Sequence, residues 1–225
     1  MKFVKLLVTL AALAGVTVNA ATVALTPADS GTSGVSYNSL SFGTGAITAT
    51  GYQWDDSSTP PNPATWAATT VRYDANGVGV AAIPSNAQVN GSTQEYILFD
   101  FGAGTTTVSS MSLYYNTTPT SNLYFTYSWL NTTVVAGSST PGVPLTTYAT
   151  TPSSSSYPNL TFNMASSGSG RYLLLGATDH AGSPTTVNYQ VNSFTYTTVP
   201  DGASTLALMG AAIATLGFAS RRRRA

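Results

Sequence analysis

The chain has 225 residues, no cysteine, and equal numbers of acidic and basic residues. Between residues 21 and 199, however, only Arg72 and Arg171 are basic, and seven acidic residues give this segment a formal charge of −5. A segment this poor in cations cannot neutralise a run of phosphates, which excludes nucleic acid and argues against anionic membrane surfaces as partners. The absence of cysteine excludes thiolate catalysis and zinc sites of the cysteine type.

The first 20 residues have the parts of a secretory signal peptide. Lys2 and Lys5 precede the apolar run 6–18, and Val18-Asn19-Ala20 places small residues at the positions that a signal peptidase inspects. We expect cleavage after Ala20. An uncleaved membrane helix is the alternative, and it is disfavoured because the apolar run is much shorter than the roughly 20 residues that a span needs.

Residues 21–198 are expected to form one all-β domain, because segments of alternating apolar and polar residues are separated by turn-forming clusters. The expected strands are 21–26, 37–42, 46–54, 69–73, 78–83, 95–101, 107–115, 123–135, 146–150, 160–164, 172–177 and 186–199. Strands of this length and spacing favour a single antiparallel β-sandwich of jelly-roll type, with an up-and-down barrel as the alternative. An N-terminal signal helix and a C-terminal transmembrane helix are expected to flank the sandwich.

The segment EYILFDF, residues 95–101, is the clearest strand. Alternation places Tyr96 and Leu98 on one face and Ile97 and Phe99 on the other. Both faces are apolar, as expected of an interior strand covered on both sides.

Two candidate binding sites lie in this domain. Asp74 and Asn76 precede Gly77 and offer two oxygen ligands for calcium, although the same residues also form a good hairpin turn without a metal, and the turn is favoured. Tyr52, Trp54 and Trp66 flank a proline-rich segment and could stack on sugar rings if they are exposed. Half-buried core positions are the alternative for these aromatic residues, and the core positions are favoured.

No coherent catalytic set appears in the sequence. His180 is the only histidine, and the abundant serines make any pairing with it uninformative. Glu95 and Asp100 are five residues apart and fall on opposite faces of their strand, and adjacent Asp55 and Asp56 diverge as well. We therefore expect no enzyme, with a secreted carbohydrate-active enzyme using Glu95, Asp100 or Asp179 as the alternative.

The last 27 residues, 199–225, have three parts. A short motif comes first, then residues 204–220 without any charge, then four arginines. A helix over 204–220 would cover roughly 25 Å of a hydrocarbon layer near 30 Å. Because cationic flanks stay on the cytoplasmic side, the domain between the two basic ends is expected to be exported. The residues of the first and last parts are Val199, Pro200, Asp201, Gly202, Arg221, Arg222, Arg223 and Arg224.

This ending resembles the PEP-CTERM sorting signals of Gram-negative bacteria, most closely the variant that begins Val-Pro-Asp followed by small residues. The resemblance implies that exosortase, a membrane-embedded cysteine transpeptidase, recognises the tail and removes it. Gly202-Ala203 differs from the Glu-Pro or Ser-Gly of many members, which leaves the exosortase subtype open. An ordinary tail-anchored surface protein is the alternative.

The domain itself resembles the β-sandwich of many PEP-CTERM precursors through four short motifs in a fixed order. They are Gly77-Val78-Gly79-Val80, Glu95-Tyr96-Ile97-Leu98-Phe99-Asp100-Phe101, Ser110-Met111-Ser112-Leu113 and Ser169-Gly170-Arg171-Tyr172-Leu173. This second resemblance supports the sandwich and names no activity.

These observations predict an exported structural or adhesive protein with weak carbohydrate binding. It would pass through the secretion machinery, be held briefly at the inner membrane by its C-terminal helix, and reach the cell surface or an exopolysaccharide matrix. Calcium is the one cofactor that the sequence suggests.

Overall fold

The structure is a computed structural model that describes ten ranges of the chain. These are residues 20–25, 34–43, 46–55, 65–80, 89–90, 94–115, 123–134, 146–150, 159–176 and 188–199. All regular secondary structure in these ranges is β-strand, which confirms the all-β prediction. The predicted signal helix and the predicted transmembrane helix lie outside the described residues.

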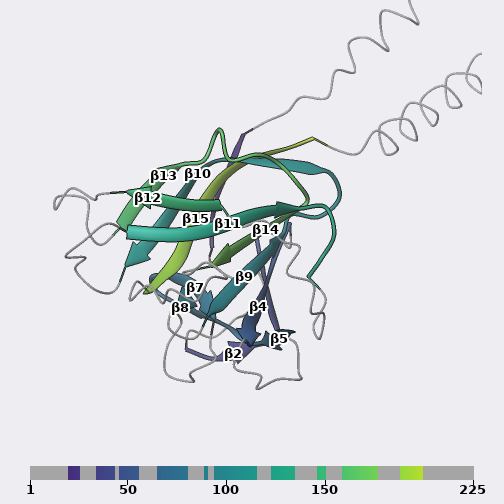
Figure 1. The fold of residues 1–225 in the computed structure, drawn as a ribbon. Coiled ribbons are helices and arrows are strands. Elements are labelled where there is room, and N and C mark those ends of the chain that lie inside the picture. Colours follow the sequence, from purple (N-terminus) through teal and green to yellow (C-terminus); the bar gives the residue numbers. More distant parts are fainter. Residues whose placement is uncertain are drawn as a thin grey trace, which may run out of the picture.

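Fifteen strands follow one another in the described ranges (Figure 1). They are β1 (Ala21–Ala24), β2 (Ser36–Tyr37), β3 (Ser39–Phe42), β4 (Ile47–Asp55), β5 (Thr65–Thr69), β6 (Val71–Asp74), β7 (Gly77–Val80), β8 (Val89–Asn90), β9 (Glu95–Asp100), β10 (Thr105–Tyr115), β11 (Leu123–Leu130), β12 (Thr146–Thr150), β13 (Asn159–Asn163), β14 (Tyr172–Gly176) and β15 (Asn188–Val199). Every predicted strand has a counterpart, but the predicted strand 37–42 is divided into β2 and β3, which belong to different sheets, and the predicted strand 123–135 ends at Leu130. The prediction missed β8 and all of β5 before Thr69, because β8 has only two residues and β5 directly follows a proline-rich run.

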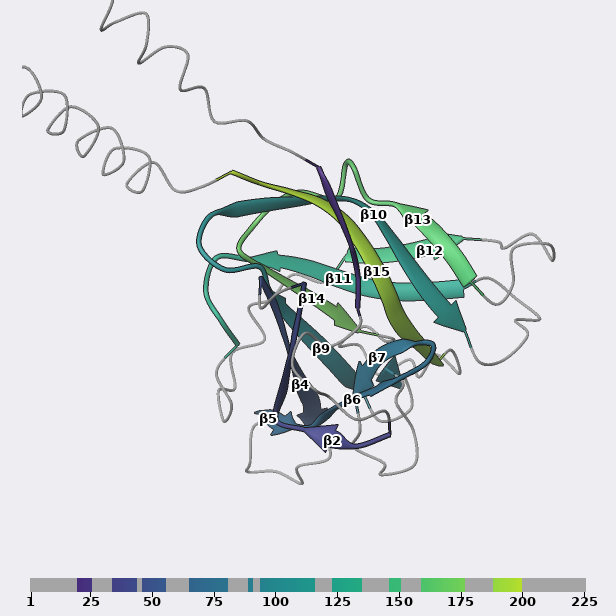
Figure 2. The same cartoon turned by 180° about the vertical axis from the view of Figure 1, so that it is seen from behind.

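The strands form two antiparallel sheets that pack face to face (Figures 1 and 2). Sheet A has eight strands in the order β13-β10-β15-β7-β6-β2, and β1 and β8 also pair with β15. Sheet B has seven strands in the order β12-β11-β14-β9-β4-β3, and β5 also pairs with β4. Two sheets with a shared interior confirm the predicted β-sandwich, and the described strands do not form the single wall of an up-and-down barrel.

Four strand pairs are nested within one another along the chain. β11 pairs with β12, β10 with β13, β9 with β14 and β7 with β15, all antiparallel. Each pair therefore encloses the previous one, and the pairs belong alternately to sheet B and sheet A.

The core lies between the two sheets and is made by alternate residues of each strand. Phe99 of β9 faces Phe194 of β15 across this interior, with ring centroids 4.8 Å apart, and Ile97 of β9 belongs to the same core cluster. Tyr96 and Leu98 belong to a separate apolar cluster on the outer side of β9. This strand is therefore covered on both faces, as its sequence predicted.

An irregularity in β15 lets one edge of that strand serve several partners. The pairing with β10 shifts between Ser112 and Leu113 and leaves Asn192 as an extra residue. The Asn192 carbonyl accepts a hydrogen bond from the Leu25 backbone at 2.9 Å, and its side-chain amide donates to the Asn76 carbonyl at 3.2 Å. The bulge thus ties both β1 and the β6–β7 turn to β15.

Candidate functional site

The two ends of the described domain lie next to each other in sheet A. β1 begins at Ala21, directly after the predicted signal cleavage point, and Ala21 lies opposite Tyr196 of β15. β15 continues to Val199, which pairs with Thr105 of β10. In Figure 1 the purple start of β1 and the yellow end of β15 reach the same end of the sandwich. Both predicted processing points therefore adjoin one end of the domain.

The sheet extends as far as the predicted sorting motif. Val199 belongs to β15, one residue beyond the predicted domain boundary at residue 198, and it is 47% exposed. Proline cannot donate a ladder hydrogen bond, so regular pairing is expected to end before Pro200. Pro200, Asp201, Gly202, residues 204–220 and the four arginines lie outside the described residues. Within the part of the chain that the structure describes, no helix could span a membrane.

The predicted calcium ligands form the β6–β7 hairpin turn. One oxygen of the Asp74 carboxylate accepts the Asn76 backbone N–H at 2.8 Å, and the other accepts the Gln190 side-chain amide at 2.7 Å. Carboxylate oxygens keep further lone pairs, so calcium binding stays a prediction. Among the described residues no group of three or more His, Cys, Asp and Glu side chains could hold a metal ion.

Gly77 closes this turn against β15. Its φ of +137° lies in the region that favours glycine, and a Cβ atom there would overlap the carbonyl oxygen of Val191. The turn can therefore reach the bulge in β15 only with glycine at this position.

The three predicted stacking residues lie together on the outer side of sheet B, where they are buried. Tyr52 and Trp54 are each 7% exposed and Trp66 is 1% exposed. The Trp66 ring meets Trp54 and Tyr96 edge-on, with centroids 4.9 Å and 5.0 Å away. The Tyr52 hydroxyl donates to the Val134 carbonyl at 3.2 Å. Stacking on a sugar would require this cluster to open, and the stacking hypothesis stays a prediction.

The carboxylates of Glu95 and Asp100 lie at opposite ends and on opposite faces of β9. Glu95 is buried on the side of Ile97 and Phe99, whereas the half-buried Asp100 is on the outer side. They do not face each other across a shared cleft, which a pair of glycosidase carboxylates requires. Asp56, Asp179 and His180 lie outside the described residues, and only the backbone of Asp55 is described.

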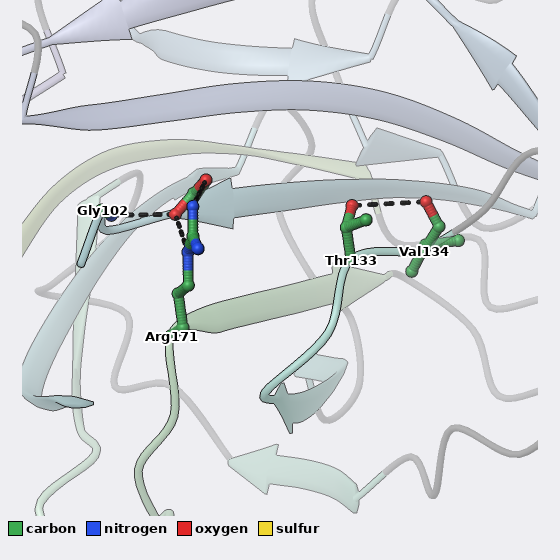
Figure 3. A network of polar contacts seen from close by, with 5 residues as sticks. Gly102, Thr133, Val134 and Arg171 are labelled. Atoms are coloured by element: carbon green, nitrogen blue, oxygen red, sulfur yellow. Dashed lines mark hydrogen bonds and ion pairs between the residues drawn. The ribbon is translucent and has the colours of Figure 1, made fainter. Parts of the chain in front are cut away.

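Asp100 instead forms a bidentate ion pair with Arg171 (Figure 3). Arg171 donates through Nε and Nη2 to the two carboxylate oxygens, each at 3.0 Å, and the Gly102 backbone N–H adds a third bond at 2.8 Å. The Arg171 guanidinium also lies 4.9 Å from the centroid of the Tyr172 ring. Asp100 belongs to the motif at residues 95–101 and Arg171 to the motif at residues 169–173, so this ion pair joins two motifs of the domain resemblance. The two motifs lie side by side because β14 pairs with β9.

Two buried tyrosines form a pair that no sequence motif indicates. Tyr115 and Tyr189 pair across β10 and β15, face the core, and have ring centroids 5.8 Å apart. Among the described residues neither hydroxyl has a hydrogen-bond partner. Burial raises the pKa of both phenols above the ordinary value of tyrosine, and for Tyr189 the neighbouring Tyr115 and Tyr96 add to this increase in pKa. Alternation could have placed both residues in the core, but not their unpaired hydroxyls.

Comparisons with known proteins found no matching family model, no matching curated protein and no matching solved structure.

Proposed function

We propose that this chain is an exported surface or extracellular-matrix protein, structural or adhesive, whose C-terminal tail exosortase removes. The observation that carries the proposal is the continuity of β15 with the sorting motif. β15 is paired up to Val199, and the next residues are Pro200 and Asp201. The sandwich is thus followed at once by the segment to be cut.

The position of β1 supports the same proposal. A chain held in the inner membrane at both ends must bring those ends to one side of its folded domain. β1 and β15 meet this requirement because Ala21 pairs with Tyr196, three residues before Val199. A domain with this arrangement can fold outside the membrane before either end is released.

We propose that the sandwich is of jelly-roll type. The support is the nesting of four antiparallel pairs around the β11–β12 pair, with β15 between β10 and β7 and β14 between β11 and β9. A jelly roll is a sandwich of this kind, in which eight strands alternate between two sheets through two Greek keys. Such domains present broad sheet faces, which suits a role in binding and assembly.

Mass spectrometry of the protein purified from its own host tests the proposal. The expected mature chain begins at Ala21 and lacks Arg221–Arg224. A control chain with all four arginines changed to glutamine should keep residues 199–225, because it lacks the arginine cluster of the proposed sorting signal. A native protein that still carries Arg221–Arg224, or that fractionates with the cytosol, would overturn the proposal.

Polysaccharide hydrolysis provides the second test. We expect no turnover by the wild-type protein. Turnover that is abolished by Glu95→Ala, Asp100→Ala or Asp179→Ala would replace the structural role with that of a secreted carbohydrate-active enzyme.

A further inference from the structure

Four strands of sheet A, namely β1, β15, β10 and β13, lie side by side (Figure 2). Their outward positions carry serine and threonine residues. The apolar residues of these strands, such as Met111, Phe162 and Phe194, point into the core, so alternate residues point outward. We call this outward surface the hydroxyl face. Its central residues are Thr22 of β1, Ser193 and Thr195 of β15, Ser110 and Ser112 of β10, and Thr161 of β13.

The strand register arranges these hydroxyls in rows across the sheet. Thr22 lies opposite Thr195, and Thr195 lies opposite Ser110. The Thr22 and Thr195 hydroxyl oxygens are 3.0 Å apart. In the next row Ser193 lies opposite Ser112, which lies opposite Thr161. Strands lie about 4.8 Å apart and alternate residues about 7 Å apart, so the face presents a two-dimensional grid of hydroxyls.

The hydroxyl face is accessible and uncharged. Thr22 and Thr161 are exposed, and the other central residues are half-buried. The sequences of β1, β10, β13 and β15 contain no Asp, Glu, Lys or Arg. The face therefore offers hydrogen-bond donors and acceptors together, without a charge of either sign.

We infer that the hydroxyl face binds a neutral polysaccharide laid across β1, β15, β10 and β13. This inference rests on the proposed export, because only an exported protein meets such a polymer. A neutral glycan also carries hydrogen-bond donors and acceptors without charge, so its hydroxyls are complementary to those of the face. Anionic polymers fit less well, since the face has no cation and the exported segment carries a formal charge of −5.

The structure of the face favours recognition of an extended polymer. Its hydroxyls sit on paired strands, and the χ1 angles of its threonines are restricted, so little freedom is lost on binding. Each exposed hydrogen bond replaces one to water and contributes little by itself. A polymer that engages several rows at once, or several protein molecules at once, would gain strength by multivalency. A second copy of this chain is a poorer occupant, because the core of a protein interface is apolar.

Co-sedimentation of the full-length protein in detergent with insoluble polysaccharides tests the inference. The neutral probes are cellulose, mannan and starch granules, and calcium alginate beads are the anionic probe. We expect the wild-type protein to bind at least one neutral probe and to bind alginate at least tenfold more weakly. The double variant Thr161→Val/Thr195→Val should lose at least tenfold in affinity for the neutral probe, because valine keeps the shape and the strand preference but removes the hydroxyl.

The matched control is Thr48→Val/Thr50→Val, which makes the same change on the outer side of sheet B, in β4. It should change the affinity by less than twofold. The inference is overturned if the wild-type protein binds none of the neutral probes, if it prefers alginate, or if the two double variants lose affinity equally. Loss of the tail in the host, measured separately, shows whether the proposed export and processing stand when glycan binding fails.

Discussion

The two outer faces of the sandwich differ in chemistry although both belong to antiparallel sheets. The outer side of sheet A carries threonine and serine, whereas the outer side of sheet B carries a second buried cluster. That cluster consists of Tyr52, Trp54, Trp66, Tyr96, Leu98, Val134, Tyr172 and Leu174. Sheet B is thus buried on both faces in this region, and the hydroxyl face of sheet A meets solvent.

The difference is visible in the strand sequences. The β10 sequence, TTTVSSMSLYY, alternates between outer positions and buried inner ones that are apolar except for Thr106, apart from the bulge between Val108 and Ser110. The sequences of β9, EYILFD, and β14, YLLLG, are almost continuously apolar. Clean alternation marks a sheet with one solvated face, and a continuous apolar run marks a strand covered on both sides. We therefore expect ligands to bind the outer side of sheet A, and the outer side of sheet B to contribute stability.

Trp66→Ala is the strongest way to test this division. Its indole is buried, and its loss should cost about 3–5 kcal/mol in the free energy of unfolding, by transfer and cavity terms together. Thr195→Ala on the hydroxyl face is the matched control and should cost about 0.5 kcal/mol. Denaturant unfolding of the two variants measures both values. Equal losses would mean that the outer side of sheet B is not a second core.

Gly77→Ala tests how closely the β6–β7 turn must approach β15, beside the hydroxyl face. The positive φ and the overlap with the Val191 carbonyl should together cost about 2–3 kcal/mol. Gly102→Ala has a similar backbone restriction, with φ +80°, but its Cβ would be 3.9 Å from the nearest atom, so about 1 kcal/mol is expected. Thermal unfolding distinguishes them. If Gly77→Ala loses no more stability than Gly102→Ala, the close approach of Gly77 to the Val191 carbonyl adds no cost of its own.

Unfolding at alkaline pH tests the core between the two sheets, where the phenols of Tyr115 and Tyr189 are buried. In the unfolded chain a tyrosine loses its proton near pH 10, whereas burial keeps Tyr115 and Tyr189 protonated in the folded protein. Their contribution to stability is complete below pH 10 and declines above it, by about 1.4 kcal/mol for each tyrosine at pH 11. Unfolding free energies at pH 8 and pH 11 measure the decline.

The variant Tyr115→Phe/Tyr189→Phe should lose about 3 kcal/mol less than the wild-type protein over this pH range. At pH 8 it should be at least as stable as the wild-type protein, because it removes two hydroxyls without partners among the described residues. An unchanged pH dependence would mean that these phenols ionise in the folded protein as they do in the unfolded chain.

The ion pair between Asp100 and Arg171, at the rim of the sheet B cluster, should contribute least to the free energy of unfolding. The Arg171 side chain is 45% exposed and that of Asp100 is 30% exposed, so solvent weakens their attraction. A double-mutant cycle with Asp100→Asn and Arg171→Gln should give a coupling free energy of about 0.5–1 kcal/mol that falls with added salt. A larger, salt-independent coupling would show that the pair is a buried part of the cluster.

Much of the fold could be predicted because alternation is a local property. Ile97 and Phe99 face the core and Tyr96 and Leu98 face outward, as their order in the sequence indicates. The same pattern could not show which outer face is covered, since that depends on strands paired across long stretches of chain. The sequence therefore leaves stacking open for Trp54 and Trp66, whereas the pairing of β4 with β5 brings them together in a buried cluster.

The candidate sites also differ in whether local sequence or long-range strand pairing determines them. The turn at Asp74 is coded by neighbouring residues and was predicted, but the Gln190 amide that binds its carboxylate is 116 residues away. The hydroxyl face was not predicted, because Thr22, Ser112 and Thr161 become neighbours only through the register of four strands.

The pairing of β1 with β15 also determines how the domain would carry mechanical force. Tension between Ala21 and Val199 would pull the two strands apart at one end, so their hydrogen bonds would break one after another. Once the N-terminus is free, tension between Val199 and a ligand held at β10 would run along the strands and load many hydrogen bonds in parallel. A load moved from Ala21 to β10 would therefore replace a weak unzipping geometry with a stronger shearing one.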